Sequence, residues 1–147
     1  MESVLAVGRE EARLRALLID PYVGSREGLK ASLEAEGCRV ETAALATQAL
    51  ALMREGEFDL AVIDLGMPPT RGVVRSAWEL ARLFRAFNPR APLVLLAAEL
   101  PRDLAAETAC VCPAVLLEKP IDPNQLRRLV RQQAGRRSAA RPAGDAA

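Results

Sequence analysis

The chain has 147 residues, of which half are apolar and 27% are charged, a balance typical of one globular domain with a single core. No apolar run reaches the roughly 18 to 20 residues of a membrane span, and acids lie near the N-terminus where a signal peptide has basic and apolar residues, so we expect a soluble, cytoplasmic protein. The absence of histidine excludes histidine-based catalytic triads and histidine-ligated metals, and three cysteines are too few for a disulfide framework.

Charge is distributed unevenly along the chain. The last 21 residues carry a net charge of +5, and the preceding 126 carry −4. The basic end could contact nucleic acid or an acidic partner, but its Ala, Gly, Pro and Arg composition is also typical of an unstructured segment. Lysines are rare and aromatic residues are absent there, so nucleic-acid binding is not expected. We therefore expect an N-terminal extension over 1–13, a folded domain over 14–133 and a disordered basic tail over 134–147.

Strands and helices are predicted to alternate from the start of the domain. The run 17–19 is apolar throughout, which is typical of a strand buried on both faces of a parallel sheet. An amphipathic helix is expected over 24–36, and the alternating pattern of 38–42 predicts an edge strand. A second amphipathic helix follows over 46–55, and the apolar run 60–63 predicts the next buried strand.

A longer helix is predicted over 73–87, because its apolar residues recur every three or four positions. The predicted apolar face comprises Val73, Ala77, Leu80, Ala81, Phe84 and Phe87. Trp78 and Val74 lie beside this face and would form a partner-binding patch if exposed or part of the core if buried, and burial is the more common fate of a lone tryptophan. The arginines of this and the preceding helix, Arg54, Arg82 and Arg85, are interpreted as solvated helix faces.

The remaining elements continue the alternation. Apolar runs predict strands over 93–96 and 114–117, with a thinly patterned helix over 101–110 between them. The last helix is better marked, since Asp122 is a favourable N-cap and Pro123 suits the first helical position. Its apolar side chains, Leu126, Leu129 and Val130, are most simply packed on the sheet, and a homodimer through this helix is the alternative.

Five strand-then-helix units predict an α/β fold with a doubly wound parallel sheet of five strands and five helices. Such sheets bind ligands at the carboxyl ends of their strands. The residues that follow the predicted strands there are Asp20, Asp64, Ala97 and Lys119. Two carboxylates and an ammonium suit a divalent cation with an anionic group, which favours phosphate chemistry over acyl transfer. No glycine-rich phosphate loop follows any strand, so a nucleotide pocket is not expected and a bound flavin has no support.

The motifs at these strand ends resemble the receiver domain of two-component response regulators. They are the run 17–20 that ends in Asp20, the Asp-Leu-Gly-Met-Pro motif over 64–68, Gly72 eight residues beyond Asp64, and the Glu-Lys-Pro motif over 118–120. The resemblance covers residues 14–132. It implies a flavodoxin-like sheet of strand order 2-1-3-4-5.

The resemblance also implies roles for the site residues. Asp64 would accept a phosphoryl group from a histidine kinase as a carboxylate nucleophile, and Lys119 would contact the phosphoryl group. Mg²⁺ would be held by Asp64, Asp20 and the backbone carbonyl of Gly66. The Lys119–Pro120 peptide is expected to be cis, which would aim the lysine inward.

Several features of the family are missing. Pro21 takes the place of the second acidic residue, so one Mg²⁺ carboxylate is absent and a weakened Mg²⁺ site is expected. The hydroxyl residue expected after the fourth strand is Ala97, and the aromatic residue expected three positions before the lysine is Leu116. Both groups that normally move on phosphorylation are therefore absent. The segment 72–92 is also several residues longer than usual, which lengthens the third helix or the segment before it.

These residues leave two function classes open. The first is a single-domain receiver that accepts phosphate on Asp64 from a histidine kinase or phosphotransfer protein and acts on an unknown downstream protein. The second is a pseudo-receiver, an interaction module that works without phosphorylation, which Pro21, Ala97 and Leu116 favour. Because Asp64 and Lys119 are both present, we favour phospho-acceptance with an atypical output. An enzyme acting on small molecules has no supporting motif and is not expected.

Overall fold

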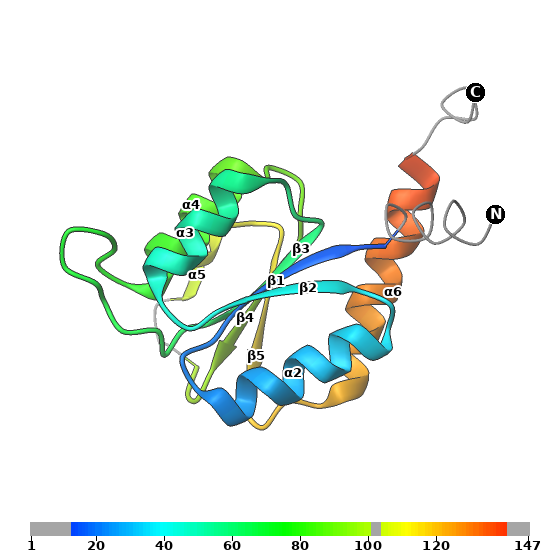
Figure 1. Cartoon of the computed structure of the whole chain (residues 1–147), viewed down its shortest axis with the longest axis horizontal. Helices are drawn as coiled ribbons and strands as arrows, with labels where there is room; N and C mark the ends of the chain where they lie inside the picture. The colour runs from blue at the N-terminus through cyan, green and yellow to red at the C-terminus, as the bar shows by residue number, and fades with distance from the viewer. Residues whose placement is uncertain (1–12, 101–103, 141–147) are drawn as a thin grey trace.

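The computed structural model describes residues 13–100 and 104–140. In this part of the chain five parallel strands form one sheet in the order β2-β1-β3-β4-β5, which confirms the predicted flavodoxin-like topology (Figure 1). The strands are β1 Arg15–Ile19, β2 Arg39–Ala43, β3 Leu60–Asp64, β4 Leu93–Ala97 and β5 Ala114–Glu118.

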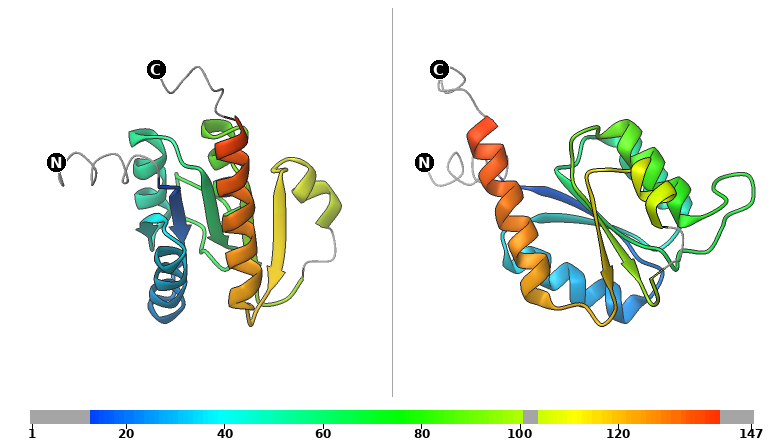
Figure 2. Two further views of the ribbon diagram at one scale, coloured as in Figure 1. Left: turned by 90° about the vertical axis from the view of Figure 1, so that its right-hand side faces the viewer. Right: turned by 180° about the vertical axis from the view of Figure 1, so that it is seen from behind.

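Helices cover both faces of the sheet. They are α2 Val23–Ala35, α3 Ala46–Glu55, α4 Ala77–Phe87, α5 Leu104–Ala109 and α6 Pro123–Ala140. The core between the sheet and α3 and α4 is separate from the core between the sheet and α2 and α6, and Figure 2 shows these two layers on opposite sides of the strands. None of the helices in 13–100 and 104–140 has the length and apolar character that a membrane span requires.

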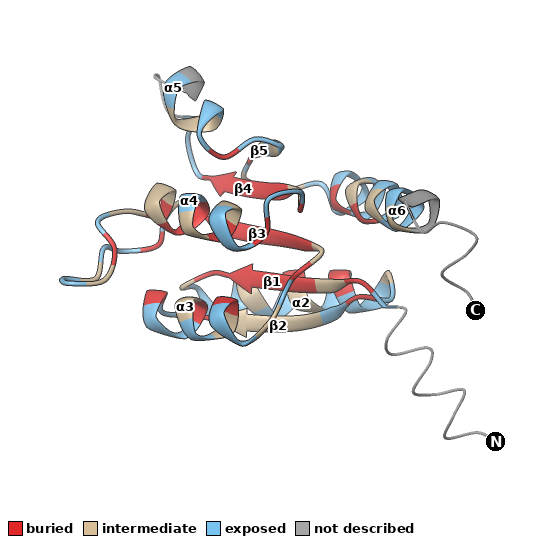
Figure 3. Cartoon of the chain, turned by 90° about the horizontal axis from the view of Figure 1, so that it is seen from above, coloured by how far each residue is buried: buried red, intermediate tan, exposed pale blue. Residues whose placement is uncertain are grey.

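The three central strands explain why continuous apolar runs predict the sheet. Every residue of β3 and β4 is buried, as are four of the five in β1, because helices pack on both faces (Figure 3). In β2, at the edge of the sheet, four of the five residues are half-buried or exposed. The alternating sequence of this segment therefore matches its position at the edge, as predicted.

Helix α4 begins at Ala77, so the prediction of a helix from residue 73 is wrong at its start. Thr70 and Val74 exchange backbone hydrogen bonds of 2.9 and 3.0 Å across a tight turn. Gly72 in this turn has a φ of 78°, a left-handed conformation that suits glycine. The chain reversal keeps Val73 and Val74 out of the helix, although their spacing continues its apolar pattern. The extra residues of this segment therefore lengthen the approach to the helix.

The end of α4 also departs from the predicted apolar face. Phe87 is 43% exposed, whereas Asn88, which follows it, is buried. The Asn88 side chain accepts a 2.8 Å hydrogen bond from the backbone N–H of Phe58 and donates to the carbonyl of Phe84, which satisfies its buried amide. Trp78 is half-buried against the core, between the two expected alternatives.

Helix α6 extends beyond residue 133, after which a disordered tail is predicted to begin. The helix begins as predicted, with the Asp122 carboxylate accepting a 2.9 Å hydrogen bond from the N–H of Asn124, but it continues to Ala140. Residues 134–140 are therefore helical, and the prediction of disorder is wrong for them. The rest of the predicted tail, 141–147, lies outside the described residues. So do residues 1–12 of the predicted N-terminal extension and residues 101–103 of the helix predicted over 101–110. Leu126 and Val130 are buried against the sheet, in agreement with the simpler interpretation of their pattern.

Arg85 is another correction, because it is not a solvated residue of a helix face. Its guanidinium donates hydrogen bonds to the backbone carbonyls of Asn88, Ala91, Val111 and Pro113. These carbonyls belong to the loops that precede β4 and β5. Burial lowers the pKa of Arg85 from its ordinary value. Arg85 therefore joins α4 to the loops at the amino ends of β4 and β5.

Candidate functional site

The register of the strands brings the predicted site residues to one edge of the sheet. Ile19 of β1 lies beside Ile63 of β3, so Asp20 and Asp64, the next residue of each strand, are neighbours. On the other side, Ala97 of β4 pairs with Glu118 of β5, and Lys119 follows directly. The residues predicted at the strand ends therefore gather on the same edge.

Asp64 is held at both of its carboxylate oxygens. The side chain is 3% exposed, with Oδ1 accepting a 2.7 Å hydrogen bond from the N–H of Gly66 and Oδ2 accepting one from the ammonium of Lys119. The Lys119–Pro120 peptide is cis, as expected. Asp64 is thus buried and forms an ion pair with Lys119. The lysine ammonium can stabilise further negative charge that develops at this carboxylate.

Asp20 is fully buried and has one carboxylate oxygen without a partner. Its Oδ1 accepts a 2.8 Å hydrogen bond from the N–H of Tyr22, whereas its Oδ2 has no hydrogen-bond partner among the described residues. Burying an anionic oxygen without a partner costs free energy, and a bound cation would remove that cost. Asp20 therefore has a free oxygen ligand beside Asp64.

These donors fit Mg²⁺ without forming a complete cage for it. Within the described residues no group of three or more His, Cys, Asp or Glu side chains could hold a metal ion. Asp20, Asp64 and the carbonyl of Gly66 offer two carboxylates and one backbone oxygen. Mg²⁺ in proteins keeps several waters and often uses only one or two carboxylates, so the remaining positions suit water and substrate oxygens. The residues present therefore fit Mg²⁺ if water and substrate oxygens complete its coordination.

Tyr22 is a residue of this site that the sequence analysis did not identify. Its ring centroid lies 5.0 Å from the Lys119 ammonium, a cation–π contact. A Cβ atom added to Gly66 would lie 3.1 Å from the Tyr22 hydroxyl and 2.9 Å from Oδ1 of Asp64, so these two oxygens flank one point beside Gly66. The side chain is more than half exposed. Tyr22 therefore forms the outer wall of the site.

Ala97 and Leu116 belong to β4 and β5, the two strands on the Lys119 side of the site. Ala97 is buried, and only its backbone carbonyl contributes a contact, a 2.8 Å hydrogen bond from the N–H of Lys119. Leu116 is half-buried in β5 and packs against the core. Neither side chain can donate a hydrogen bond. Ala97 is the last residue of β4, and Leu116 lies within β5.

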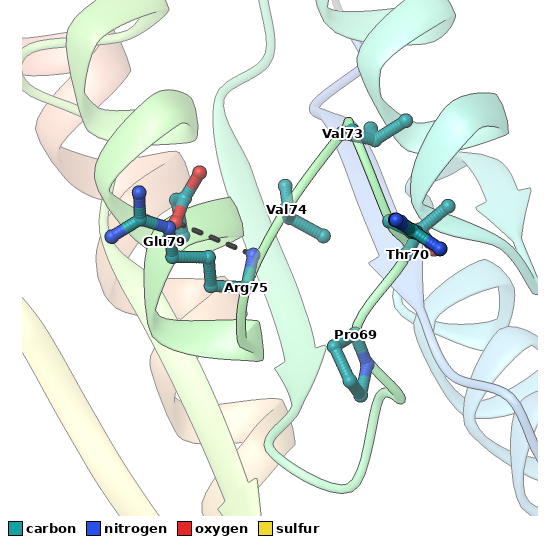
Figure 4. A pocket seen from close by; sticks show the side chains of 8 residues that line it. Pro69, Thr70, Val73, Val74, Arg75 and Glu79 are labelled. Carbon is teal, nitrogen blue, oxygen red and sulfur yellow. Dashed lines mark hydrogen bonds between the residues drawn. The ribbon is translucent and has the colours of Figure 1, made fainter.

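A separate hollow lies beside the turn that precedes α4. It has a volume of about 710 Å³ and is lined by residues 69–75 and Glu79. Figure 4 shows the Glu79 carboxylate accepting a hydrogen bond, 3.3 Å long, from the backbone N–H of Arg75. Asp20, Asp64 and Lys119 are not among the lining residues, so the hollow is distinct from the carboxylate site.

Comparison with known proteins identifies the family of the chain. Residues 16–131 match the family model of the response regulator receiver domain. The chain is 30% identical over 115 residues to the sensor histidine kinase AruS of Pseudomonas aeruginosa, an alignment that covers 78% of this chain and 11% of that kinase. The chain thus spans about a tenth of the length of this curated relative.

Solved structures show the same fold. A CheY-like response regulator receiver domain protein from Methanospirillum hungatei JF-1 superposes with a TM-score of 0.75 at 22% identity, covering 86% of this chain and 98% of that chain. A response regulator protein from Burkholderia pseudomallei, solved with a phosphorylated aspartic acid, a calcium ion and citrate, gives a TM-score of 0.70 at 20% identity, covering 86% and 71%.

Proposed function

The chain belongs to the response regulator receiver domain family of two-component signalling, and we propose that Asp64 accepts a phosphoryl group. Receiver domains are signalling modules that interact with histidine kinases or phosphotransfer proteins. Here the phosphoryl group would come from a phosphohistidine of such a partner. The downstream protein would be recognised through protein contacts.

The contacts of Asp64 and Lys119 support this chemistry. A carboxylate oxygen of Asp64 attacks phosphorus, the bond from phosphorus to the histidine nitrogen breaks, and an acyl phosphate forms on Asp64. The Lys119 ammonium, already on the carboxylate, donates to a phosphoryl oxygen as negative charge arrives there. Mg²⁺, when bound by Asp20, Asp64 and the carbonyl of Gly66, supplies further positive charge at the phosphoryl oxygens.

The unpartnered Oδ2 of Asp20 is the observation that carries the proposal. A structural ion pair needs only Asp64 and Lys119, and a second buried carboxylate beside that pair would merely destabilise the fold. A buried free oxygen is what a cation-dependent phosphoryl site requires. The Burkholderia pseudomallei structure supports this interpretation, because it contains both a phosphorylated aspartic acid and a divalent cation in the same fold.

The test is the intact mass of the protein after incubation with acetyl phosphate and Mg²⁺, and separately with a phosphorylated histidine kinase. We expect one phosphoryl adduct on the wild-type chain, less adduct when EDTA replaces Mg²⁺, and none on Asp64→Asn. Glu79→Gln, on the separate hollow, serves as the matched control and keeps the adduct. An unmodified mass with both donors contradicts phospho-acceptance.

The alternative is a phosphorylation-independent pseudo-receiver. It is favoured by Pro21, Ala97 and Leu116, which remove one metal ligand and both switch groups. Under this alternative a partner protein binds wild-type and Asp64→Asn chains with equal affinity. Under the main proposal its affinity changes when the wild-type chain is phosphorylated, and Asp64→Asn shows no such change.

A further inference from the structure

We propose that the Tyr22 hydroxyl donates a hydrogen bond to the phosphoryl group on Asp64, replacing the donor that Ala97 lacks. This inference rests on the proposed function and adds a residue to the same site. It concerns how the phosphorylated state is recognised within the domain. Tyr22 is then the switch residue of this chain.

A cation–π contact with Lys119 and the position of its hydroxyl beside Gly66 place the Tyr22 side chain at the site. Its ring lies on the Lys119 ammonium, and its hydroxyl shares the space beside Gly66 with Oδ1 of Asp64. Lys119 and Asp64 are the two groups that a phosphoryl group on Asp64 would touch. A phenol hydroxyl at this position is therefore a second donor, beside the Lys119 ammonium, for the oxygens of a phosphoryl group on Asp64.

The backbone of Tyr22 is fixed while its side chain is exposed. Its N–H donates to Asp20 Oδ1 at 2.8 Å, and its carbonyl accepts a 2.8 Å hydrogen bond from the N–H of Arg26 in α2. The side chain is 53% exposed, so rotation about its own bonds meets little packing. The Tyr22 side chain can therefore rotate toward a phosphoryl group on Asp64 while its backbone stays in place.

On the wall formed by β4 and β5, neither Ala97 nor Leu116 has a side-chain donor that would compete with Tyr22. The side chains of Ala97 and Leu116 carry no polar hydrogen, so a phosphoryl oxygen facing β4 and β5 finds none from them. Tyr22 is the residue immediately before α2, which begins at Val23. Phosphorylation would therefore change the structure at the start of α2 instead of the structure of β4 and β5.

The single tyrosine of the chain makes the test direct. Protein grown with 3-fluorotyrosine gives one ¹⁹F resonance from Tyr22, and beryllofluoride with Mg²⁺, a mimic of the aspartyl phosphate, adds its own bound ¹⁹F signals. One spectrum thus reports occupancy of Asp64 and the environment of Tyr22 separately. We expect bound fluoride signals together with a shifted Tyr22 resonance, and neither change in Asp64→Asn.

Affinity measurements separate the hydroxyl from the ring. Tyr22→Phe retains the ring over Lys119 and should weaken beryllofluoride binding about five- to tenfold, the effect of one hydrogen bond to a charged group at a partly exposed position. Val23→Ala, at the next residue, which is also exposed, should leave binding unchanged. In an Ala97→Thr background the Tyr22→Phe loss should shrink, because threonine restores a donor, and this non-additivity indicates a shared target.

The outcomes distinguish the two proposals. Bound fluoride signals with an unmoved Tyr22 resonance and full affinity in Tyr22→Phe would overturn the role of Tyr22 and leave Asp64 as the acceptor. Absence of bound fluoride in the wild-type chain, together with an unmodified mass after kinase treatment, would overturn the proposed function and this inference with it. Weaker binding in Tyr22→Phe that is unaffected by Ala97→Thr would also overturn the replacement of one donor by the other.

Discussion

The Arg85 guanidinium donates two hydrogen bonds to the carbonyl oxygen of Val111, through Nε at 3.1 Å and Nη2 at 2.8 Å. Val111 is itself fully buried in the core under α4. Through this oxygen a helix side chain is joined to the segment that leads into β5. The planar guanidinium makes the arrangement specific, because a lysine has only one nitrogen to offer.

Arg85→Met should lower the free energy of unfolding by about 2 kcal/mol, because backbone carbonyls lose their donor while the side chain keeps its length. Urea denaturation gives the difference from the midpoint at an unchanged slope. Arg82→Met is the matched control on the same helix. Arg82 has an exposed ion pair with Glu107, 3.1 Å long, so its loss should cost less than about 0.5 kcal/mol. Equal losses in the two variants would show that Arg85 contributes no more than a surface charge.

Asp20→Asn should make the fold more stable in EDTA, by about 1 kcal/mol, because it replaces a buried, partly unpartnered anion with a neutral amide. Thermal unfolding would then show a melting temperature a few degrees above that of the wild-type chain. Mg²⁺ should raise the melting temperature of the wild type and leave that of the variant unchanged, since binding to the native state alone stabilises it.

Asp59→Asn is the contrast for that experiment. The Asp59 carboxylate accepts hydrogen bonds from the Arg15 N–H at 2.7 Å and from the Arg137 guanidinium at 3.1 Å. The same substitution should therefore destabilise the chain at this position. Stabilisation by both substitutions would indicate a general effect of removing negative charge and would remove the evidence for a cation site at Asp20.

Cys38 should make stability fall in alkaline solution. Burial, with smaller effects from Glu36 and Asp59, raises the pKa of its thiol to about 11 from an ordinary value of 9.0. The unfolded chain therefore loses this proton at lower pH than the folded chain does. The stabilising contribution is complete below pH 9.0 and is lost as the pH rises toward 11. Urea midpoints across this range should fall more for the wild type than for Cys38→Ala, and parallel falls would contradict the assignment.

Gly66→Ala should reduce phosphoryl adduct formation at least tenfold while the chain stays folded. The added Cβ would lie 2.9 Å from Asp64 Oδ1 and 3.1 Å from the Tyr22 hydroxyl, so one of these groups must move. Gly28→Ala is the matched control, because no atom lies within 4 Å of its added Cβ. In the middle of α2 that change should stabilise the chain by about 0.5 to 1 kcal/mol and leave the adduct intact. Normal adduct formation in Gly66→Ala would show that Asp64 tolerates the shift.

The sheet could be predicted from the sequence because its central strands are buried on both faces. Runs such as 60–63 need no tertiary information to be recognised as strands, and the carboxyl-end rule then places Asp20, Asp64 and Lys119 together. The start of α4 could not be predicted in this way. The apolar spacing of Val73 and Val74 suits a helix, and only the turn at Gly72 shows that they lie outside it.

Residues whose roles depend on distant partners were missed for a different reason. Arg85 has the composition of a solvated helix position, and its acceptors are carbonyls up to 28 residues away along the chain. Tyr22 follows Asp20 in the sequence, but its contact with Lys119 depends on the pairing of strands across the sheet. The extension of α6 to Ala140 could not be predicted, because a composition of Ala, Gly and Arg occurs both in helices and in unstructured segments.

The contacts of Arg137 join the last helix, α6, to the residues before β1. Its guanidinium donates to the carbonyl of Arg13 at 2.8 Å as well as to Asp59, so the chain enters and leaves at one pole of the sheet. Asp64 is the last residue of β3, and the carboxyl ends of the strands lie at the opposite pole of the sheet, as the strand arrows in Figure 1 show. A domain with adjoining ends can be inserted into a longer polypeptide as a cassette. Linkers attached to this domain would emerge together and leave the aspartate uncovered for a docking protein.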